Sequence, residues 1–185
     1  MNLLQKIRNS FTNTDEAAPA AASFATRPDT IYAPISGMLV SMPEINDEII
    51  SSGLLGDGYG ILPVGNVIYA PATGRIDTVT VTNHAIGVLT SAGHEILIHV
   101  GIDTVKMEGK GFKRLVEAGD QVVAGQPLLT FDPAAIAAAG YEDMVSIVLF
   151  NPEAFSKVRH VGESSTLIDN RPLVKVGDPL IVAKP

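Results

Sequence analysis

From Ile31 onward the sequence is a succession of short apolar runs, each of which ends at Gly, Pro, Asn or Asp. The runs read IYAPISGMLVSM, YGILPVGNVIYAPATGRIDTVTVT, AIGVLT, EILIHVGI, QVVAGQPLLTFD, VSIVLF and PLIVAKP. Turn signals that recur roughly every 8–12 residues are typical of sandwiches and barrels. We therefore predict an all-β fold, an antiparallel β-sandwich of the barrel-sandwich kind. Helix is expected only as short turns at 112–117 and at 133–139, where Pro133 precedes an alanine-rich run.

Two pairs of segments in this region echo one another. YAPISGMLVSM at residue 32 and YAPATGRIDTV at residue 69 share Tyr-Ala-Pro-x-x-Gly, and EAGDQVVAGQPLLTFD resembles VKVGDPLIVAKP. Paired β-units of this kind are typical of barrel-sandwich folds, which include the biotinyl carrier domains. A biotin or lipoyl role has little support, because no lysine lies at a hairpin tip in a Met-Lys-Met context.

The composition divides the chain into three zones. Residues 1–11, MNLLQKIRNSF, place apolar residues at helical spacing, with Lys6 and Arg8 outside that face. Such a segment either docks as a short helix on its own domain or associates weakly with an anionic membrane surface. Residues 12–30 are rich in Ala, Pro, Thr and Asp, which predicts a linker. Residues 31–185 form the predicted domain, long enough for a real core.

Charge and cysteine content narrow the classes of function. The net charge is −7 and no basic stripe is visible, so binding to nucleic acid is disfavoured. An acidic surface suits a partner with a positive docking face. The absence of cysteine excludes disulfides, thiol nucleophiles and thiolate metal sites. No apolar run reaches the ~20 residues of a spanning helix, and no secretory signal is present, so a cytoplasmic protein is expected.

The chain has four histidines, and two of them are candidates for chemistry. For His94, beside a glycine turn, and for His160, after Lys and Arg, we expect plain surface roles. His84 and His99 flank a predicted hairpin, in NHAIGVLT and GHEILIHV.

If Ser91 and Ala92 form the hairpin turn, paired residue numbers add up to 183 and His84 lies directly opposite His99. A bulge at Gly93 would change that sum to 184 and remove the strict pairing.

Two facing imidazoles have three interpretations. In the first, they are a structural pair. In the second, they are half of a zinc site that an acidic residue such as Asp57 or Asp103 completes, although no HExxH-like spacing supports a metal site. In the third interpretation one histidine attacks a phosphoryl group while the other hydrogen-bonds to the phosphoryl oxygens. Gly101 would then allow close approach of the backbone.

The motifs TNHAIG, EILIHVGIDTVKMEGKGF, LLGDGYGILP and APATGRI closely resemble enzyme IIA of the glucose class, from the bacterial phosphoenolpyruvate-dependent sugar phosphotransferase system. The resemblance runs from about Ile31 to Pro185, and LIHVGIDTVxxxGxGF is highly specific for that family. It implies an antiparallel β-sandwich with a shallow apolar depression. It also implies a phosphocarrier that receives phosphate from the carrier HPr and passes it to a cysteine on a IIB domain.

The resemblance also implies roles for individual residues. His99 matches the histidine that is phosphorylated at Nε2, His84 the second active-site histidine, and Thr82 the threonine that orients an imidazole. The residues expected to flank the site and meet partner proteins are Asp57, Asp103, Ile86, Val100 and Gly101. The two carboxylates would face cationic partner residues rather than the phosphate. Relatives often carry phenylalanine near each active histidine, where this chain has Ile86 and Val100.

The partners implied by the resemblance are HPr and the IIB/IIC sugar permease. Regulatory targets in the family are sugar permeases, glycerol kinase and adenylate cyclase. No cofactor is required, although His84 and His99 could bind zinc together with a partner's carboxylate. The alternative function is a zinc-dependent hydrolase on a related β-scaffold. The transported sugar is not identified, because specificity belongs to the IIC domain.

Overall fold

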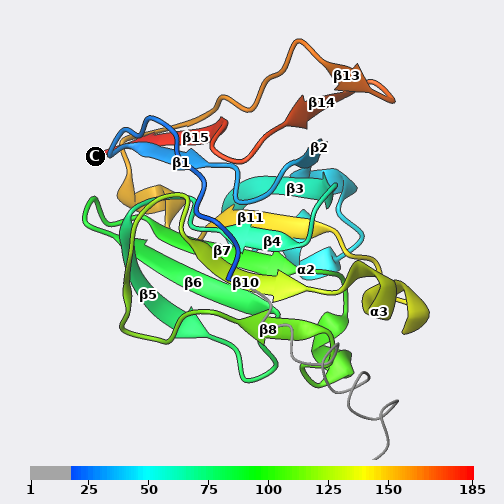
Figure 1. Cartoon of the computed structure of the whole chain (residues 1–185). Coiled ribbons are helices and arrows are strands. Elements are labelled where there is room, and N and C mark those ends of the chain that lie inside the picture. Colours follow the sequence, from blue (N-terminus) through cyan, green and yellow to red (C-terminus); the bar gives the residue numbers. More distant parts are fainter. Residues whose placement is uncertain (1–17) are drawn as a thin grey trace, which may run out of the picture.

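The computed structural model describes residues 18–185, which form antiparallel sheets of nine, three and three strands (Figure 1). This architecture confirms the predicted antiparallel β-sandwich. The segment 1–11 lies outside the described residues, so its association with membranes stays a prediction. None of the helices in the described range is both long enough and apolar enough to cross a bilayer.

The large sheet contains, in spatial order, β13 (Leu167–Ile168), β14 (Arg171–Val174), β2 (Gly37–Ser41), β3 (Asp57–Pro63), β11 (Val145–Leu149), β7 (Glu95–Val100), β6 (Ala85–Thr90), β5 (Gly74–Val79) and β9 (Gln121–Val122). The second sheet contains β1 (Thr30–Tyr32), β15 (Pro179–Lys184) and β12 (Lys157–His160). The third contains β4 (Val67–Tyr69), β10 (Pro127–Phe131) and β8 (Phe112–Arg114).

Helical structure within residues 18–185 is short. It consists of η1 (Met42–Glu44), α2 (Glu48–Ser51), η2 (Thr104–Met107), α3 (Pro133–Ala138) and η3 (Pro152–Ala154). The helix expected at 133–139 is confirmed, and the side chain of Asp132 caps its first turn by accepting from the N–H groups of Ala134 and Ala135. The turn expected at 112–117 is wrong: Phe112 begins strand β8 and pairs with Phe131 of β10. Pairing with a distant strand overrides the local turn signal there.

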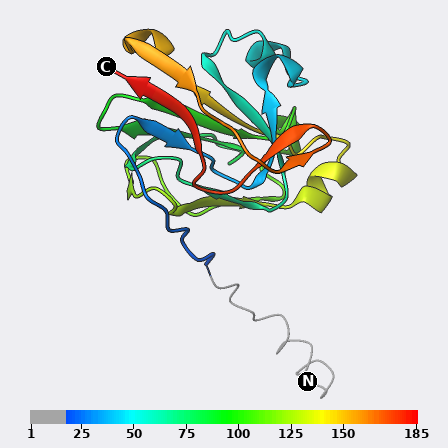
Figure 2. The same ribbon diagram turned by 90° about the horizontal axis from the view of Figure 1, so that it is seen from above.

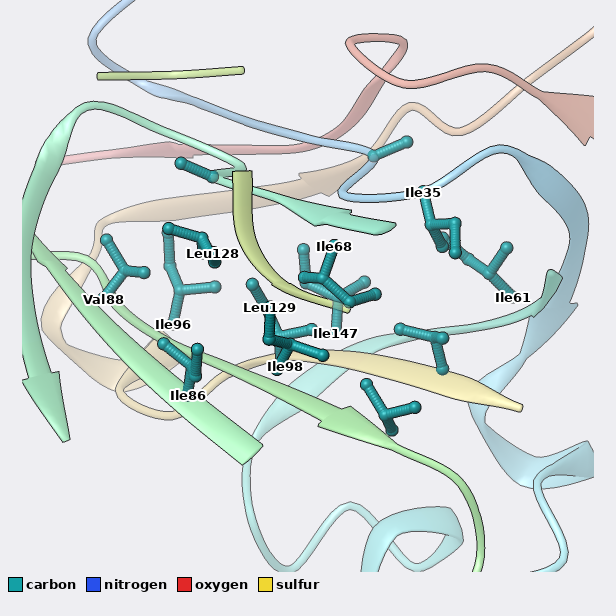
Figure 3. Close-up of a cluster of buried hydrophobic side chains, with 14 of the residues drawn as sticks. Ile35, Ile61, Ile68, Ile86, Val88, Ile96, Ile98, Leu128, Leu129 and Ile147 are labelled. Atoms are coloured by element: carbon teal, nitrogen blue, oxygen red, sulfur yellow. The ribbon is translucent and has the colours of Figure 1, made fainter. Parts of the chain in front are cut away.

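The main core is filled from all three sheets. Figure 3 shows Ile68 and Leu129, from β4 and β10, packed near Ile98 and Ile147 of the large sheet. All four side chains are fully buried. Burial of this kind, at about 25 cal/mol per Å² of apolar surface, is the main stabilising term for a sandwich.

A second, smaller apolar cluster lies on the opposite face of the large sheet. Its buried members are Val40, Met42, Ile45, Ile50, Met144 and Val148, contributed by β2, β11, η1, α2 and the loops beside them. Strand β11 is buried along its whole length, because Ile147 faces the main core while Val148 faces this second cluster. Segment 42–51 therefore covers the middle of the sheet on the side away from the main core.

The two Tyr-Ala-Pro echoes in the sequence pair with each other. The N–H of Tyr32 donates to the carbonyl of Pro71 at 2.9 Å, and the N–H of Tyr69 donates to that of Pro34 at 2.8 Å. Each motif also meets one of the other two echoed segments. Gly177 donates to the first motif and Gly125 to the second. The sequence echoes thus correspond to two equivalent turns of the fold.

Part of the predicted linker 12–30 contacts the domain. The N–H of Ala22 donates to the carbonyl of Gly125 at 2.9 Å, and the ring of Phe24 packs on Tyr32 with centroids 5.2 Å apart. A side chain at Gly177 would collide with Phe24, and both glycines have positive φ. Figure 2 shows this segment running along the outside of the domain before β1. Residues 22–24 are therefore attached, while the domain boundary stays a prediction.

His94 is not the surface residue that the sequence suggested. Its side chain is fully buried, with Nε2 3.0 Å from the carbonyl of Ala183 and Nδ1 3.2 Å from Oγ1 of Thr90. The ring also stacks on Phe155 at 4.7 Å. Because a carbonyl only accepts, Nε2 carries the proton and Nδ1 accepts from Thr90. His94 thus ties the β6–β7 hairpin to the last strand, β15.

We expect His94→Ala to lower the free energy of unfolding by about 2–4 kcal/mol, because it leaves a cavity and an unpaired hydroxyl in the core. Urea unfolding followed by circular dichroism measures this. The control is His160→Ala, at an exposed histidine, which should change stability little. Equal losses in the two variants would contradict the structural role of His94.

Candidate active site

The β6–β7 hairpin has a register one residue away from the predicted one. Ala85 pairs with His99 and Ile86 with Ile98, so paired numbers add up to 184. The cause is Gly93, which has φ of 86° and donates to the carbonyl of Thr90 at 3.0 Å. A left-handed glycine at this position adds one residue to the turn, as in a bulged three-residue hairpin. Strict pairing of the two histidines is therefore wrong.

The two imidazoles nevertheless lie side by side. The ring centroids of His84 and His99 are 4.8 Å apart, and the planes meet at 89°. His84 precedes the first residue of β6, and its carbonyl accepts from the N–H of Val100 at 2.8 Å. The turn before it contains Asn83 at a φ of 58°, a conformation that asparagine tolerates better than most residues.

Two threonine hydroxyls surround Nδ1 of His84. Oγ1 of Thr82 lies 2.6 Å from it and Oγ1 of Thr80 lies 3.3 Å from it. Thr80 also accepts from the N–H of Ala85 at 3.1 Å, which anchors the turn. Thr82 was expected here from the sequence, whereas Thr80 was not. The signal for Thr80 was its position four residues before the histidine, on the same polar turn.

His99 projects from the large sheet on the side opposite the main core. Its neighbours Ile98 and Val100 are fully buried in that core, and alternation along β7 places His99 on the other face. Nδ1 of His99 is buried and the ring has a backbone hydrogen bond with Gly101, whereas Nε2 is not enclosed in this way. The nitrogen available to a substrate is therefore Nε2.

Burial keeps both imidazoles neutral at neutral pH. It is the main cause that lowers the pKa of His84 from 6.5 to about 4, and proximity to His99 adds to it. Burial also lowers the pKa of His99, against opposing effects of Asp47 and of the backbone of Gly101. A neutral imidazole has a lone pair on one nitrogen and a proton on the other, so each ring can act as a nucleophile or as a donor.

The loop after β7 is held in one conformation. Gly101 has φ of 82°, and a Cβ there would lie 2.2 Å from Cγ2 of Thr104. The buried hydroxyl of Thr104 donates back to the carbonyl of Val100 at 2.5 Å, and Gly101 N–H donates to Met144 at 2.7 Å. The backbone beside His99 thus requires glycine at this position.

Each of the two predicted flanking carboxylates has a hydrogen-bond donor in its own chain. Asp103 accepts from Nζ of Lys106 at 2.7 Å, and Asp57 lies 2.8 Å from Nε2 of His160. Asp103 follows His99 by four residues on the loop just described. Asp57 of β3 pairs with Leu149 of β11, which lies three residues along β11 from Ser146, the residue that pairs with His99. The hydrogen bond of the Asp57 carboxylate goes to His160 and not to His84 or His99.

Ile86 and Val100 are not on the surface, contrary to expectation. Their side chains are 1% and 0% exposed and belong to the main core. The shifted register explains Ile86, because it pairs with inward-facing Ile98 and a one-residue slip reverses the face. Val100 follows His99 directly and must point the opposite way. Exposed apolar side chains on segments near the site are Ile49, Leu54, Val81 and Val105.

The histidine pair lacks a third metal ligand. No group of three His, Asp or Glu side chains at metal-binding spacing occurs in the part of the chain that the structure describes. Asp57 and Asp103, considered as zinc ligands from sequence, bind His160 and Lys106 instead. The pair supplies two of the four ligands of a zinc site, so a partner would have to provide the remainder.

Comparisons with known proteins agree with this geometry. The chain is 34% identical to the glucose-specific EIIA component of Staphylococcus aureus, over 74% of this chain and 82% of that protein. It is 38% identical to the beta-glucoside-specific EIIBCA component of Bacillus subtilis over 73% of this chain, but spans only 22% of that relative. It spans about a quarter of the other curated relatives that it matches first.

A solved structure gives the same fold. The glucose permease IIA from Mycoplasma capricolum matches with a TM-score of 0.71 and 31% identity, over 86% of this chain and 99% of that one. The model of the family "phosphoenolpyruvate-dependent sugar phosphotransferase system, EIIA 1" matches residues 29–155, which include His84 and His99. The chain therefore belongs to the EIIA 1 family of the phosphoenolpyruvate-dependent sugar phosphotransferase system.

Proposed function

We propose that this chain is a phosphocarrier in sugar uptake. Nε2 of His99 accepts a phosphoryl group from phospho-HPr and donates it to a cysteine of a sugar-specific IIB domain. The observation that carries the proposal is the pair of neutral imidazoles 4.8 Å apart, one of them held at Nδ1 by Thr82. Membership of the EIIA 1 family supports it.

The chemistry follows from the two rings. The lone pair on Nε2 of His99 forms the new N–P bond while the donor's N–P bond breaks, and that electron pair returns to the donor imidazole. When the hydroxyl of Thr82 donates to Nδ1 of His84, the proton of that ring lies on Nε2, where it can bind a phosphoryl oxygen. Catalysis is then positioning and charge stabilisation, without a cofactor. Zinc binding by the pair would need a partner's carboxylate.

Partner proteins would dock on the surface that surrounds His84 and His99. Asp57 and Asp103 are partly exposed carboxylates that suit cationic groups on a partner, and Val81 and Val105 add exposed apolar surface. Such a small apolar patch with a charged rim fits brief encounters rather than an obligate interface. The name EIIBCA of a matching relative joins an A part to B and C parts, which supports a IIB/IIC permease as the acceptor.

A regulatory role is proposed alongside transfer. The phosphorylation state of His99 would choose among sugar permeases, glycerol kinase and adenylate cyclase, because a dianionic group at the centre of the docking surface changes its charge. We also propose that the protein is cytoplasmic and that residues 1–11 associate weakly with a membrane surface.

We expect His99→Ala to abolish phosphorylation by phosphoenolpyruvate, enzyme I and HPr. The variant should keep most of its thermal stability, since the half-buried ring of His99 lies outside the main core. Mass spectrometric mapping of the phosphorylated residue makes the measurement. His160→Ala is the control and should be phosphorylated normally. Full phosphorylation of His99→Ala would contradict the assignment of His99 as the phosphorylated residue.

His84→Gln should still accept phosphate at His99 but transfer it onward slowly, by about one to two orders of magnitude if one phosphoryl-oxygen donor is weakened. The amide can keep a hydrogen bond but cannot carry imidazolium charge. Rapid-quench measurement of transfer to a IIB domain tests this. Wild-type transfer rates would show that the two histidines do not act together.

Histidine titration in the free protein should follow the burial of the two rings. His84 is expected to protonate near pH 4 and His99 below its ordinary value, measured by ¹H–¹⁵N NMR of the imidazoles. Because the folded-state pKa of His84 is depressed, its contribution to stability is complete above pH 6.5 and is lost as pH falls toward 4. A measured pKa of 6.5 for both rings would contradict the expected effect of burial on their pKa values.

A further inference from the structure

A groove of about 490 Å³ lies on the small sheet, in which β1 and β15 run side by side (Figure 1). Its lining includes Val182 of β15, whose register partners are Thr30 of β1 and Arg159 of β12. Ile181 and Ala183, on either side of Val182, are fully buried in the main core, so Val182 and its partners lie on the outer face of the sheet. No residue of the candidate active site lines this groove.

One wall of the groove is the part of the linker at residues 25–27. The preceding residue, Phe24, fixes this wall by packing on Tyr32. The N–H of Arg27 donates to the hydroxyl of Tyr32 at 2.7 Å, and the carbonyl of Arg27 accepts from the N–H of Thr30 at 3.2 Å. The strand beneath the wall therefore holds it in place, and the groove is formed without a ligand.

Two arginines line the groove from opposite sides. Arg27 belongs to the linker wall beside β1, whereas Arg159 belongs to β12, on the other side of β15. Neighbouring strands in a sheet are about 4.8 Å apart, so the backbones of β1 and β12 are roughly 10 Å apart. Long arginine side chains on the two sides can therefore reach one small group that lies between them.

Neither of these arginines forms an ion pair with another described residue. The other arginines in residues 18–185 each bind a carboxylate of their own chain at 2.8–2.9 Å; they are Arg75, Arg114 and Arg171. The neighbouring carboxylate of Asp29 does not line the groove and lies 3.7 Å from Nζ of Lys184. The two arginines without a carboxylate partner in this range are thus the two that share the groove.

We propose that this groove binds a phosphate monoester with an apolar or aromatic body. Two guanidinium groups match the charge of a phosphate monoester, and each can bind phosphate oxygens through paired N–H···O bonds. Tyr32 also lines the groove, and because its hydroxyl accepts from Arg27, its own hydrogen is available as a further donor. Much of the remaining lining is apolar and suits the body of the ligand, as at Ala25, Val161 and Pro179. The proposal does not rest on the phosphocarrier function.

The test is a titration of the unphosphorylated full-length chain with phenyl phosphate, followed by amide ¹H–¹⁵N NMR. We expect saturable shifts at Val161, Gly177 and Val182, and weaker binding of inorganic phosphate or of phenol, each of which lacks one part of the ligand. Arg27→Ala and Arg159→Ala should each weaken binding by about ten-fold or more, as for loss of a hydrogen bond to a charged group. Both side chains are exposed, so the variants should fold.

Arg75→Ala is the matched control, because it removes an exposed arginine that does not line the groove. It should bind phenyl phosphate with wild-type affinity. The proposal would be overturned if the wild-type chain showed no saturable shifts, or if the double variant Arg27→Ala, Arg159→Ala bound as tightly as wild type. Shifts confined to the surroundings of His84 and His99 would place the ligand at the histidine pair and would also overturn it.

Phosphate monoesters occur both as soluble molecules and as the headgroup of phosphatidic acid, and vesicles distinguish these sources. The full-length wild type and the double variant are sedimented with phosphatidylcholine vesicles that contain phosphatidic acid. Both chains carry residues 1–11, so any lipid binding by that segment is common to them. Vesicle binding that falls about ten-fold or more in the double variant would identify a lipid headgroup as the ligand. Equal sedimentation, with phenyl phosphate binding lost in the double variant, would identify a soluble ester.

Discussion

The arrangement of the site depends on how β7 pairs with β6 on one side and β11 on the other. Because side chains alternate along β7, the pairing that sends Ile98 into the main core sends His99 to the opposite face. The same pairing puts Ala85 and Ser146 beside His99, and the short turn before β6 then brings in His84. A slip of one residue would bury His99, so the core that stabilises the sheet also fixes the orientation of the histidine pair.

The fold and the histidine pair could be predicted because they leave local signals. Frequent turn residues indicated a sandwich, and the short segment between NHAIGVLT and GHEILIHV indicated a hairpin. The register could not be settled, because it depends on whether Gly93 adopts a positive φ, and glycine allows both signs. That single conformational choice moved Ile86 from the expected docking surface into the core. The two rings remained neighbours, since imidazoles reach across a one-residue offset.

The environments of the other titratable residues depend on contacts that no local pattern encodes. His94 is buried because a carbonyl 89 residues away, on the last strand, accepts from its ring. Asp57 binds His160, which is 103 residues later in the sequence. Ser146 in VSIVLF differs from its apolar neighbours, but only the register shows that it faces His99. Residue types were thus visible in the sequence, whereas their partners followed from the topology.

The electrostatics of the site divide between its centre and its rim. At the centre, burial keeps both imidazoles neutral, so the pair does not repel a cationic partner and retains a lone pair for phosphate. At the rim, Asp57 and Asp103 are already bound to His160 and Lys106 through exposed contacts. Exposed polar contacts of this kind stabilise a protein little, so a partner's cation can replace the internal donor at small cost. In the proposed docking, each carboxylate would exchange one weak contact for another, which favours the rapid release that a phosphocarrier needs.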